Sequence, residues 1–140
     1  MGIKRRAREL ALQMMFQLDL GTVELKQLEE NFLPGASAPE AAKTLALEMV
    51  RNTWTRLPEL DGRLRDLAEH WDLSRMAAVD RNILRLASHE ILYDPRVPKS
   101  VAINEAIEIV KRFSTDVSGK FVNGILDRLD KGGTPPPPAP

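Results

Sequence analysis

The stretch at residues 97–129, VPKSVAINEAIEIVKRFSTDVSGKFVNGILDRL, decides the fold because it contains two amphipathic helical patterns in close succession. Pro95 and Pro98 precede the first pattern, and proline is excluded from a helix interior because it lacks the N–H and clashes with the preceding turn. Apolar residues then recur at helical spacing at Ile103, Ala106, Ile107, Val110 and Phe113. A polar break at residues 114–119 leads to a second stripe of Val122, Ile125, Leu126 and Leu129. Two consecutive helices are therefore predicted.

The rest of the chain continues this helical pattern. Residues 3–20 are predicted to form a helix whose core face carries Ile3, Ala7, Leu10, Met14 and Leu18. Gly21 is suited to end that helix. Further helical patterns cover residues 22–33, 37–57, 58–71 and 75–93, and no alternation typical of strands is present. The predicted fold is all-α, with about seven helices in two small half-domains packed together.

Length and composition narrow the class of protein. The 140 residues, 43% hydrophobic and 29% charged, are typical of one globular domain, with half-domains expected at about residues 1–70 and 71–131. Residues 132–140, GGTPPPPAP, are expected to be a disordered tail. The chain has no cysteine, no apolar run near the ~20 residues of a membrane span, and no apolar segment typical of a signal peptide. These features suit a reducing cytoplasm.

Two segments carry a family resemblance. VAINEAIEIVKRFSTDVSGKFVNGILDRL resembles the C-terminal signature of the NusB family of bacterial transcription antitermination factors, and VDRNILRLASHEIL is similar to the same family. The resemblance implies two small helical units packed together and binding of the boxA element, a single-stranded RNA segment of ribosomal leader transcripts. It also implies joint binding with NusE, a ribosomal small-subunit protein, within an antitermination complex on RNA polymerase. Such a protein tethers RNA and catalyses no reaction.

A cluster of basic residues opens the first predicted helix. Four of the 20 Lys and Arg residues lie at Lys4, Arg5, Arg6 and Arg8, although the net charge of the chain is zero. Cations at a helix N-terminus oppose the helix dipole at a cost of up to about 1 kcal/mol, which a polyanion would reverse. Arginine binds phosphate bidentately and stacks on bases, so RNA is a natural ligand. The alternative is an ordinary solvated helix start.

Two phenylalanines are candidates for base stacking. Phe16 lies about 160° around the helix from its core face, on the side of Arg5 and Leu12. It would be either a stacking platform or a core residue. In the NusB family an aromatic residue at this point contacts RNA, and many members have tyrosine there. The pattern alone favours a core position for Phe121, whereas the resemblance implies that Phe121 and Lys120 contact RNA.

Three further expectations concern Gly124, Leu12 and the chemistry of the chain. Gly124 would allow close approach of another helix or a ligand. An exposed strip of Phe16 and Leu12 would favour a homodimer of the free chain. The histidines, His70 and His89, are isolated, and no carboxylate pair, glycine-rich phosphate loop or nucleophile motif is present. No catalytic residue, cofactor or metal is therefore expected.

Two other functions remain open. NusB-like RNA-binding domains precede a catalytic domain in certain ribosomal RNA methyltransferases. Because this chain ends in a proline-rich tail soon after the shared region, that function would make it a fragment. The second alternative is a helical scaffold that only oligomerises and has no affinity for RNA.

Overall fold

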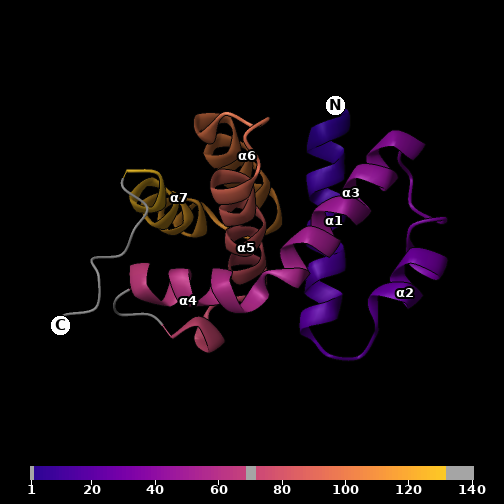
Figure 1. Cartoon of the computed structure of the whole chain (residues 1–140), viewed down its shortest axis with the longest axis horizontal. Coiled ribbons are helices and arrows are strands. Elements are labelled where there is room, and N and C mark those ends of the chain that lie inside the picture. Colours follow the sequence, from indigo (N-terminus) through magenta and orange to yellow (C-terminus); the bar gives the residue numbers. More distant parts are fainter. Residues whose placement is uncertain (1, 69–71, 132–140) are drawn as a thin grey trace. The chain divides into compact units, whose positions relative to one another are not determined.

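The computed structural model describes residues 2–68 and 72–131, and helices dominate this part of the chain (Figure 1). The expected tail at residues 132–140 and His70 lie outside the described residues. No strand occurs among the described residues, and the all-α prediction is confirmed. In chain order the helices are α1 Ile3–Asp19, α2 Leu25–Gln27, α3 Glu40–Thr55, α4 Leu57–Leu67, α5 Ala78–Tyr93, α6 Lys99–Phe113 and α7 Asp116–Asp130. A π-helical turn, Leu28–Phe32, continues α2, and a short 3-10 turn, Leu73–Arg75, precedes α5.

The chain divides into two compact units, one ending at Thr55 and one beginning at Arg56. This boundary differs from the one expected near residue 70. The reason is that α4 packs against α5 and α7, so it belongs with the second unit. A sequence pattern locates a helix but does not show which neighbours its apolar stripe meets.

The first unit is built on the packing of α1 against α3. The face that the sequence predicts is buried at Leu10, Met14 and Leu18, but Leu12 and Met15 are also buried. Burial of α1 therefore extends well beyond one stripe. Ile3, expected in the core, is 47% exposed because it stands at the first residue of the helix.

Gly21 ends α1 as predicted. Its φ of +77° is left-handed, a conformation that costs a residue with a side chain but is open to glycine. Its N–H donates to the Leu18 carbonyl oxygen at 3.0 Å, and the Leu20 N–H donates to the Phe16 carbonyl oxygen at 3.2 Å. These bonds satisfy carbonyls that the end of the helix would otherwise leave without a partner.

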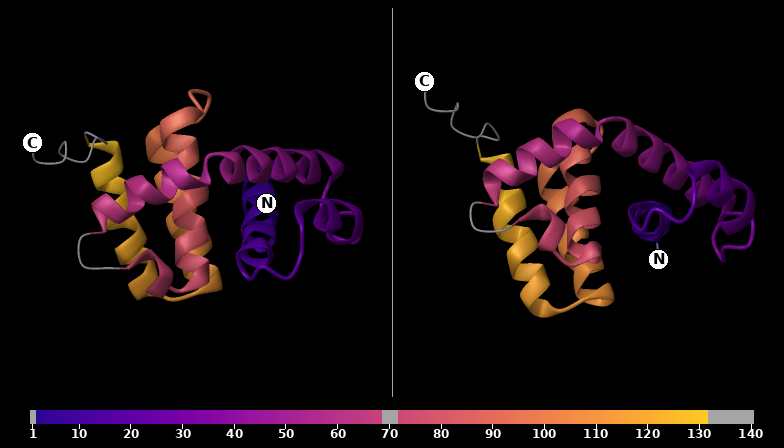
Figure 2. Two further views of the ribbon diagram at one scale, coloured as in Figure 1. Left: turned by 60° about the horizontal axis from the view of Figure 1, so that its bottom comes forward. Right: turned by 90° about the horizontal axis from the view of Figure 1, so that it is seen from below.

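The second unit is a bundle with α5 at its centre, packed against α4, α6 and α7 (Figure 2). The turn between α5 and α6 lies at one end of the bundle, and the turn between α6 and α7 lies at the other. Ile83, Leu84 and Leu86 of α5 are buried, together with Ile109 of α6 and Leu126 of α7.

Buried polar contacts also join the helices of this bundle. Arg85 Nε and Nη2 each donate to one carboxylate oxygen of Asp61 at 2.8 Å, which ties α5 to α4 in a bidentate pair. Asn82 Oδ1 accepts from Arg85 Nη1 at 3.0 Å. Arg128 Nη1 of α7 donates to the Leu67 carbonyl oxygen at 2.8 Å, at the end of α4. The buried guanidinium of Arg85 is thus paired, as a buried charge requires.

None of the helices in the described ranges combines the length and the apolar composition that a membrane span needs.

Candidate nucleic-acid interface

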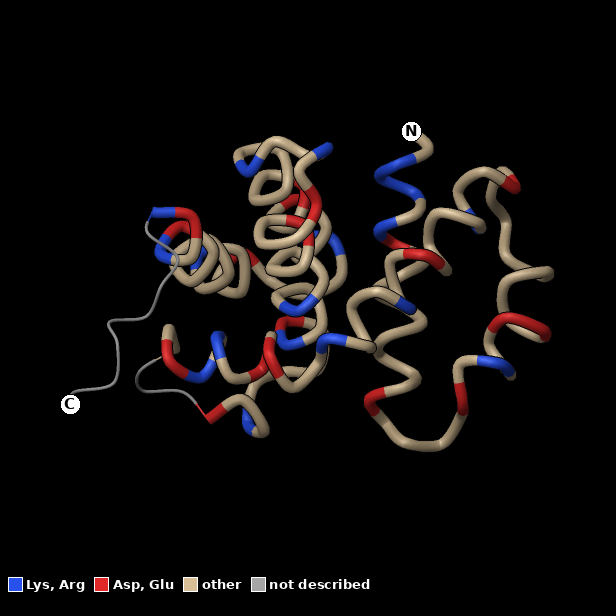
Figure 3. Tube along the Cα trace, viewed as in Figure 1, with Lys and Arg blue, Asp and Glu red and all other residues tan. Residues whose placement is uncertain are grey.

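The basic run at the start of α1 is intact as a cluster but uneven in exposure. Figure 3 shows Lys and Arg concentrated on the first turns of this helix. Lys4 is exposed, Arg5 and Arg6 are partly exposed, and Arg8 is only 6% exposed. The four cations therefore do not present equal surfaces to a ligand.

Arg6 is engaged within the first unit. Its Nε and Nη2 donate to the Ser37 carbonyl oxygen at 3.3 and 3.1 Å, and its Nη1 lies 3.3 Å from Glu9 Oε1. Glu9 is buried, at 1% exposure. These contacts tie α1 to the loop before α3, so Arg6 has a structural role whatever else it binds.

The start of α1 is electrostatically suited to an anion. Its first turn contains no acidic residue, and its N-cap residue, Gly2, has no side chain to cap the helix. The free N–H groups and the positive end of the helix dipole add to the charge of Lys4 and Arg5. Phosphate is the kind of group that such a helix start favours.

Phe16 is neither fully exposed nor fully buried. The structure places it in the last turn of α1, and the residue is partly exposed. Leu12, expected beside it on an open surface, is only 3% exposed. The exposed apolar strip of Phe16 and Leu12 that motivated a homodimer is therefore absent from this structure, and Phe16 alone supplies a partly accessible ring.

The second group of candidate residues lies on α7, in the other unit. Lys120 is exposed and Phe121 is partly exposed, whereas the next residue, Val122, is completely buried. The two candidates are therefore at the margin of the core stripe, as the helical spacing predicts. Lys4, Arg5, Arg6, Arg8 and Phe16 share one helix, and Lys120 and Phe121 share another.

A polar network holds the first turn of α7. Thr115, the N-cap residue, accepts from the Ser118 N–H through its Oγ1 at 3.1 Å. Ser118 Oγ donates to Asp80 Oδ2 of α5 at 3.0 Å and lies 3.0 Å from Ser114 Oγ. Burial raises the pKa of Asp80, while the Ser118 bond acts to lower it. This network anchors the first turn of α7, which directly precedes Lys120 and Phe121.

The glycines of α7 have roles that the sequence pattern assigns to the wrong position. A Cβ added at Gly124 would meet nothing within 4 Å, so no other helix in the described part of the chain approaches it closely. At Gly119 a Cβ would lie 3.2 Å from Lys111 Cγ of α6. Gly119 is therefore the glycine of α7 that α6 approaches closely, through Lys111. The sequence indicates this only through the position of Gly119 in the polar break, next to Lys120.

Among the described residues, no group of three or more His, Asp or Glu side chains could hold a metal ion. The ring of His89 lies 5.3 Å from the Tyr93 ring, centroid to centroid, at a tilt of 43°, and burial together with the nearby charge of Arg56 lowers the pKa of His89.

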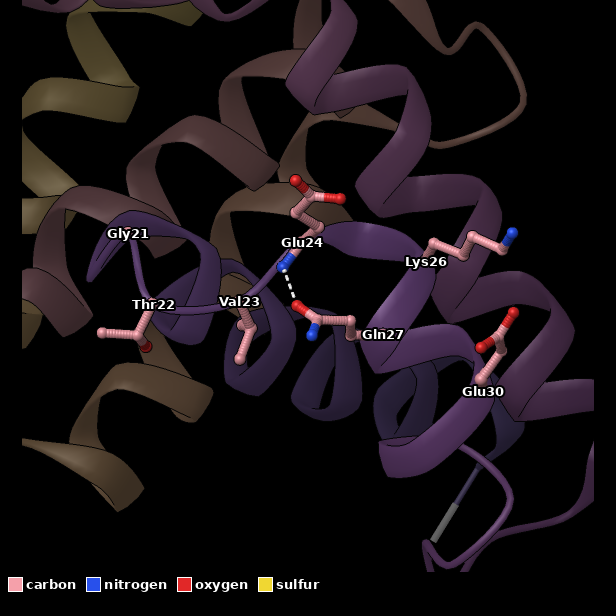
Figure 4. Close-up of a pocket in the computed structure, with 7 residues that line it drawn as sticks. All are labelled: Gly21, Thr22, Val23, Glu24, Lys26, Gln27 and Glu30. Atoms are coloured by element: carbon pink, nitrogen blue, oxygen red, sulfur yellow. Dashed lines mark hydrogen bonds between the residues drawn. The ribbon is translucent and has the colours of Figure 1, made fainter.

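A surface hollow in the first unit lies around the start of α2 (Figure 4). Glu24, Lys26 and Glu30 contribute its charged side chains, and the Glu24 N–H donates to Gln27 Oε1 at 2.8 Å. With two carboxylates and one ammonium group, this hollow does not suit a polyanion.

Comparison with known proteins places the chain in a family. A model of the NusB family matches residues 5–131. The transcription antitermination protein NusB of Desulfitobacterium hafniense (strain DSM 10664 / DCB-2) is 46% identical over 128 residues, covering 90% of this chain and 86% of that protein.

Solved structures show the same fold. The structure of T. maritima NusB is 38% identical and covers 95% of this chain and 93% of its own, with a TM-score of 0.81. A chain in the crystal structure of antitermination factors NusB and NusE in complex with dsRNA has a TM-score of 0.75 at 23% identity, covering 94% of this chain and 98% of its own. The sequence match over nearly the whole described chain, carried on the same arrangement of helices, shows that this protein belongs to the NusB family.

Proposed function

We propose that this chain is a transcription antitermination factor that binds boxA-type single-stranded RNA of ribosomal leader transcripts together with NusE. In this proposal the bound RNA stays tethered to the elongating RNA polymerase, and the assembly resists termination. The observation that carries it is the uncapped, acid-free start of α1 with Lys4 and Arg5, in a chain of the NusB family. The protein would act in the cytoplasm by recognition, without catalysis.

The proposed roles follow the placement of each side chain. Lys4 and Arg5 contact phosphates at the start of α1, where the helix dipole supports them. Phe16 and Phe121 stack on unpaired bases, because a partly exposed ring offers one face to a base while the rest remains packed. Lys120 adds a phosphate contact on α7. Arg6 holds the loop before α3 in place, and Arg8, which is buried, supports the same region of α1.

The test is a fluorescence titration of a boxA-like RNA and a scrambled RNA of equal length, with and without NusE. We expect preference for the boxA-like RNA and tighter binding when NusE is present. Absence of RNA binding under both conditions would contradict the proposal and favour the scaffold that only oligomerises.

Two double variants that each remove two positive charges test whether RNA binding depends on the start of α1. Lys4→Gln/Arg5→Gln is expected to lower the salt slope of binding by roughly 0.7 per lost phosphate contact. The control, Lys26→Gln/Arg51→Gln, removes the same charge from exposed side chains of the same unit and should leave the slope unchanged. Equal effects in both variants would mean that total charge, and not the start of α1, determines binding.

A further inference from the structure

The end of the second unit that carries the turn between α5 and α6 exposes apolar side chains. Tyr93, the last residue of α5, is 38% exposed, and Val101, in the first turn of α6, is 42% exposed. Pro95 and Pro98 of the connecting turn are exposed as well, and Val97 between them is partly exposed. Together these five residues form the turn surface. Apolar side chains that are exposed side by side, unlike scattered ones, indicate a contact surface.

The aromatic residue of this surface is held in place by the start of α4. The Tyr93 hydroxyl donates to Glu59 Oε2 at 2.6 Å, and the Arg56 guanidinium carbon lies over the ring, 4.0 Å from its centroid. His89, one turn earlier on α5, lies 5.3 Å from the same ring. Because Tyr93 is already fixed by these contacts, it loses little conformational freedom when another group packs against its exposed part.

The chain leaves the second unit at this same end. From the turn after α6, at the opposite end of the bundle, α7 runs back along α5 and α6 (Figure 2). Lys99 Nζ, at the start of α6, lies 4.0 Å from Asp130 Oδ1, at the end of α7. Lys131 follows Asp130 and precedes residues 132–140, which lie outside the described residues. That segment therefore begins beside the first turn of α6, which carries Val101.

The sequence of that segment, GGTPPPPAP, has the chemistry of a ligand for an apolar surface. It contains no charged side chain, and its two glycines give the backbone the freedom to reverse direction after α7. Consecutive prolines favour the polyproline II conformation, in which residues 134–140 would span about 22 Å. Since packed helices such as α7 and α5 lie about 8–10 Å apart, this length is sufficient to cross the end of the bundle. Proline-rich segments bind surfaces that present aromatic side chains, and a pre-extended segment has little entropy to lose.

We propose that residues 134–140 dock on the turn surface of their own chain. Proline rings pack against Tyr93 and Val101, and burial of apolar area supplies the attraction, because the segment has no charge to contribute. The docked segment covers the turn surface and so prevents a second copy of the chain from binding there. This contact lies at the end of the bundle opposite the turn between α6 and α7, and it does not depend on the proposed RNA binding.

A spin label in the segment tests the docking on the full chain. Because the sequence has no cysteine, Ala139→Cys provides a single attachment site for a nitroxide. We expect the nitroxide to broaden the backbone amide NMR signals of the non-proline residues within 93–101. The signals of residues 113–121, at the opposite end of the bundle, should stay sharp. Absence of broadening at residues 93–101, or equal broadening at both ends, would overturn the docking.

Matched variants separate docking from simple attachment of the segment near the turn surface. Replacing the four prolines at 135–138 with serine keeps the length of the segment and the whole helical bundle but makes the segment flexible. Most of the broadening at residues 93–101 should then be lost. Tyr93→Leu and Val101→Ser, made separately, should each reduce it, whereas Val117→Ser, which changes an exposed valine at the opposite end, should not. If all four variants showed the broadening of the wild type, the segment would be attached but not docked.

A mixed sample shows whether the segment binds its own chain or a neighbouring one. Wild-type chains labelled with 15N are mixed with an equal amount of unlabelled, spin-labelled Ala139→Cys chains. Because only broadening between different molecules is visible in this mixture, we expect the signals of residues 93–101 to remain sharp. Broadening of these signals in the mixture would mean that the segment binds a second copy of the chain, and it would overturn docking within one chain.

Discussion

At the scale of single residues, the basic run on α1 separates into two kinds of cation. Lys4 is exposed at the first turn, whereas Arg6 donates three hydrogen bonds to Ser37 and Glu9. A side chain that is already engaged would have to break those bonds before binding a phosphate. Charge in the sequence is therefore a weaker guide to the ligand surface than the contacts that each charge makes.

This difference predicts opposite effects for two substitutions. Arg6→Ala should lower the free energy of unfolding by about 1–2 kcal/mol, because a buried glutamate and a loop carbonyl lose a charged donor. Lys4→Ala should leave stability unchanged and lower the salt slope of RNA binding by roughly 0.7. Urea unfolding and RNA titrations over a salt series on the same samples measure both. If Arg6→Ala kept the stability of the wild type but lowered the salt slope of RNA binding, Arg6 would be a phosphate contact and not a structural residue.

Phe16 offers a second prediction at this scale, because leucine can replace its apolar contacts but not its ring. Phe16→Leu should change stability by less than about 1.5 kcal/mol, as conservative apolar exchanges do. RNA binding should weaken by about 1–3 kcal/mol through loss of stacking. Phe16→Tyr, which keeps the ring, is the control and should bind RNA like the wild type. If Phe16→Leu binds normally, Phe16 is only a packing residue.

At the scale of helices, buried polar contacts decide which elements stay together. The pair of Asp61 and Arg85 joins α4 to α5, with side chains only 11% and 7% exposed. Asp61→Ala would leave a buried guanidinium without its carboxylate, and we expect a loss of about 3–5 kcal/mol in the free energy of unfolding. The exposed pair of Glu29 and Arg51, at 2.9 Å, is the control. Glu29→Ala should cost no more than about 1 kcal/mol by the same measurement.

The contact between Asp80 of α5 and Ser118 of α7 predicts a pH dependence. Burial raises the pKa of Asp80 above its ordinary value of 3.8. The folded state therefore favours the protonated carboxyl group, and this contribution to stability is lost as the pH rises through the folded pKa. The stability of Asp80→Asn relative to the wild type should accordingly increase from about pH 4 upward.

Unfolding experiments at several pH values check this prediction, and Ser118→Ala provides an independent variant. Because the Ser118 bond acts to lower the pKa of Asp80, its removal should raise that pKa further and steepen the pH dependence. A difference between Asp80→Asn and the wild type that stays constant with pH would show that Asp80 titrates normally.

At the scale of the whole molecule, the oligomeric state depends on which apolar surface remains open. The sequence favours a homodimer through Phe16 and Leu12, but Leu12 is buried. We therefore expect sedimentation equilibrium to show a monomer of 15.7 kDa for the free chain. A species of twice that mass would mean that the homodimer forms through another surface, and Phe16→Leu would then leave the dimer intact.

The helices and their order are determined by the sequence alone, because apolar spacing and chain-breaking residues act locally. Gly21 ends α1 in the left-handed conformation that only its lack of a Cβ makes easy. The AINEAIE and KFVNGILD segments identify the family before any coordinate is known, and the family match over residues 5–131 confirms it.

Only the tertiary structure decides which face of each helix is covered and by what. A helical wheel places Leu12 opposite the core stripe, yet the residue is only 3% exposed. The sequence pattern likewise assigns a close approach to Gly124, although the stem of Lys111 packs on Gly119. Periodicity records the direction in which a side chain projects from its own helix, whereas burial depends on contacts with residues distant in the chain.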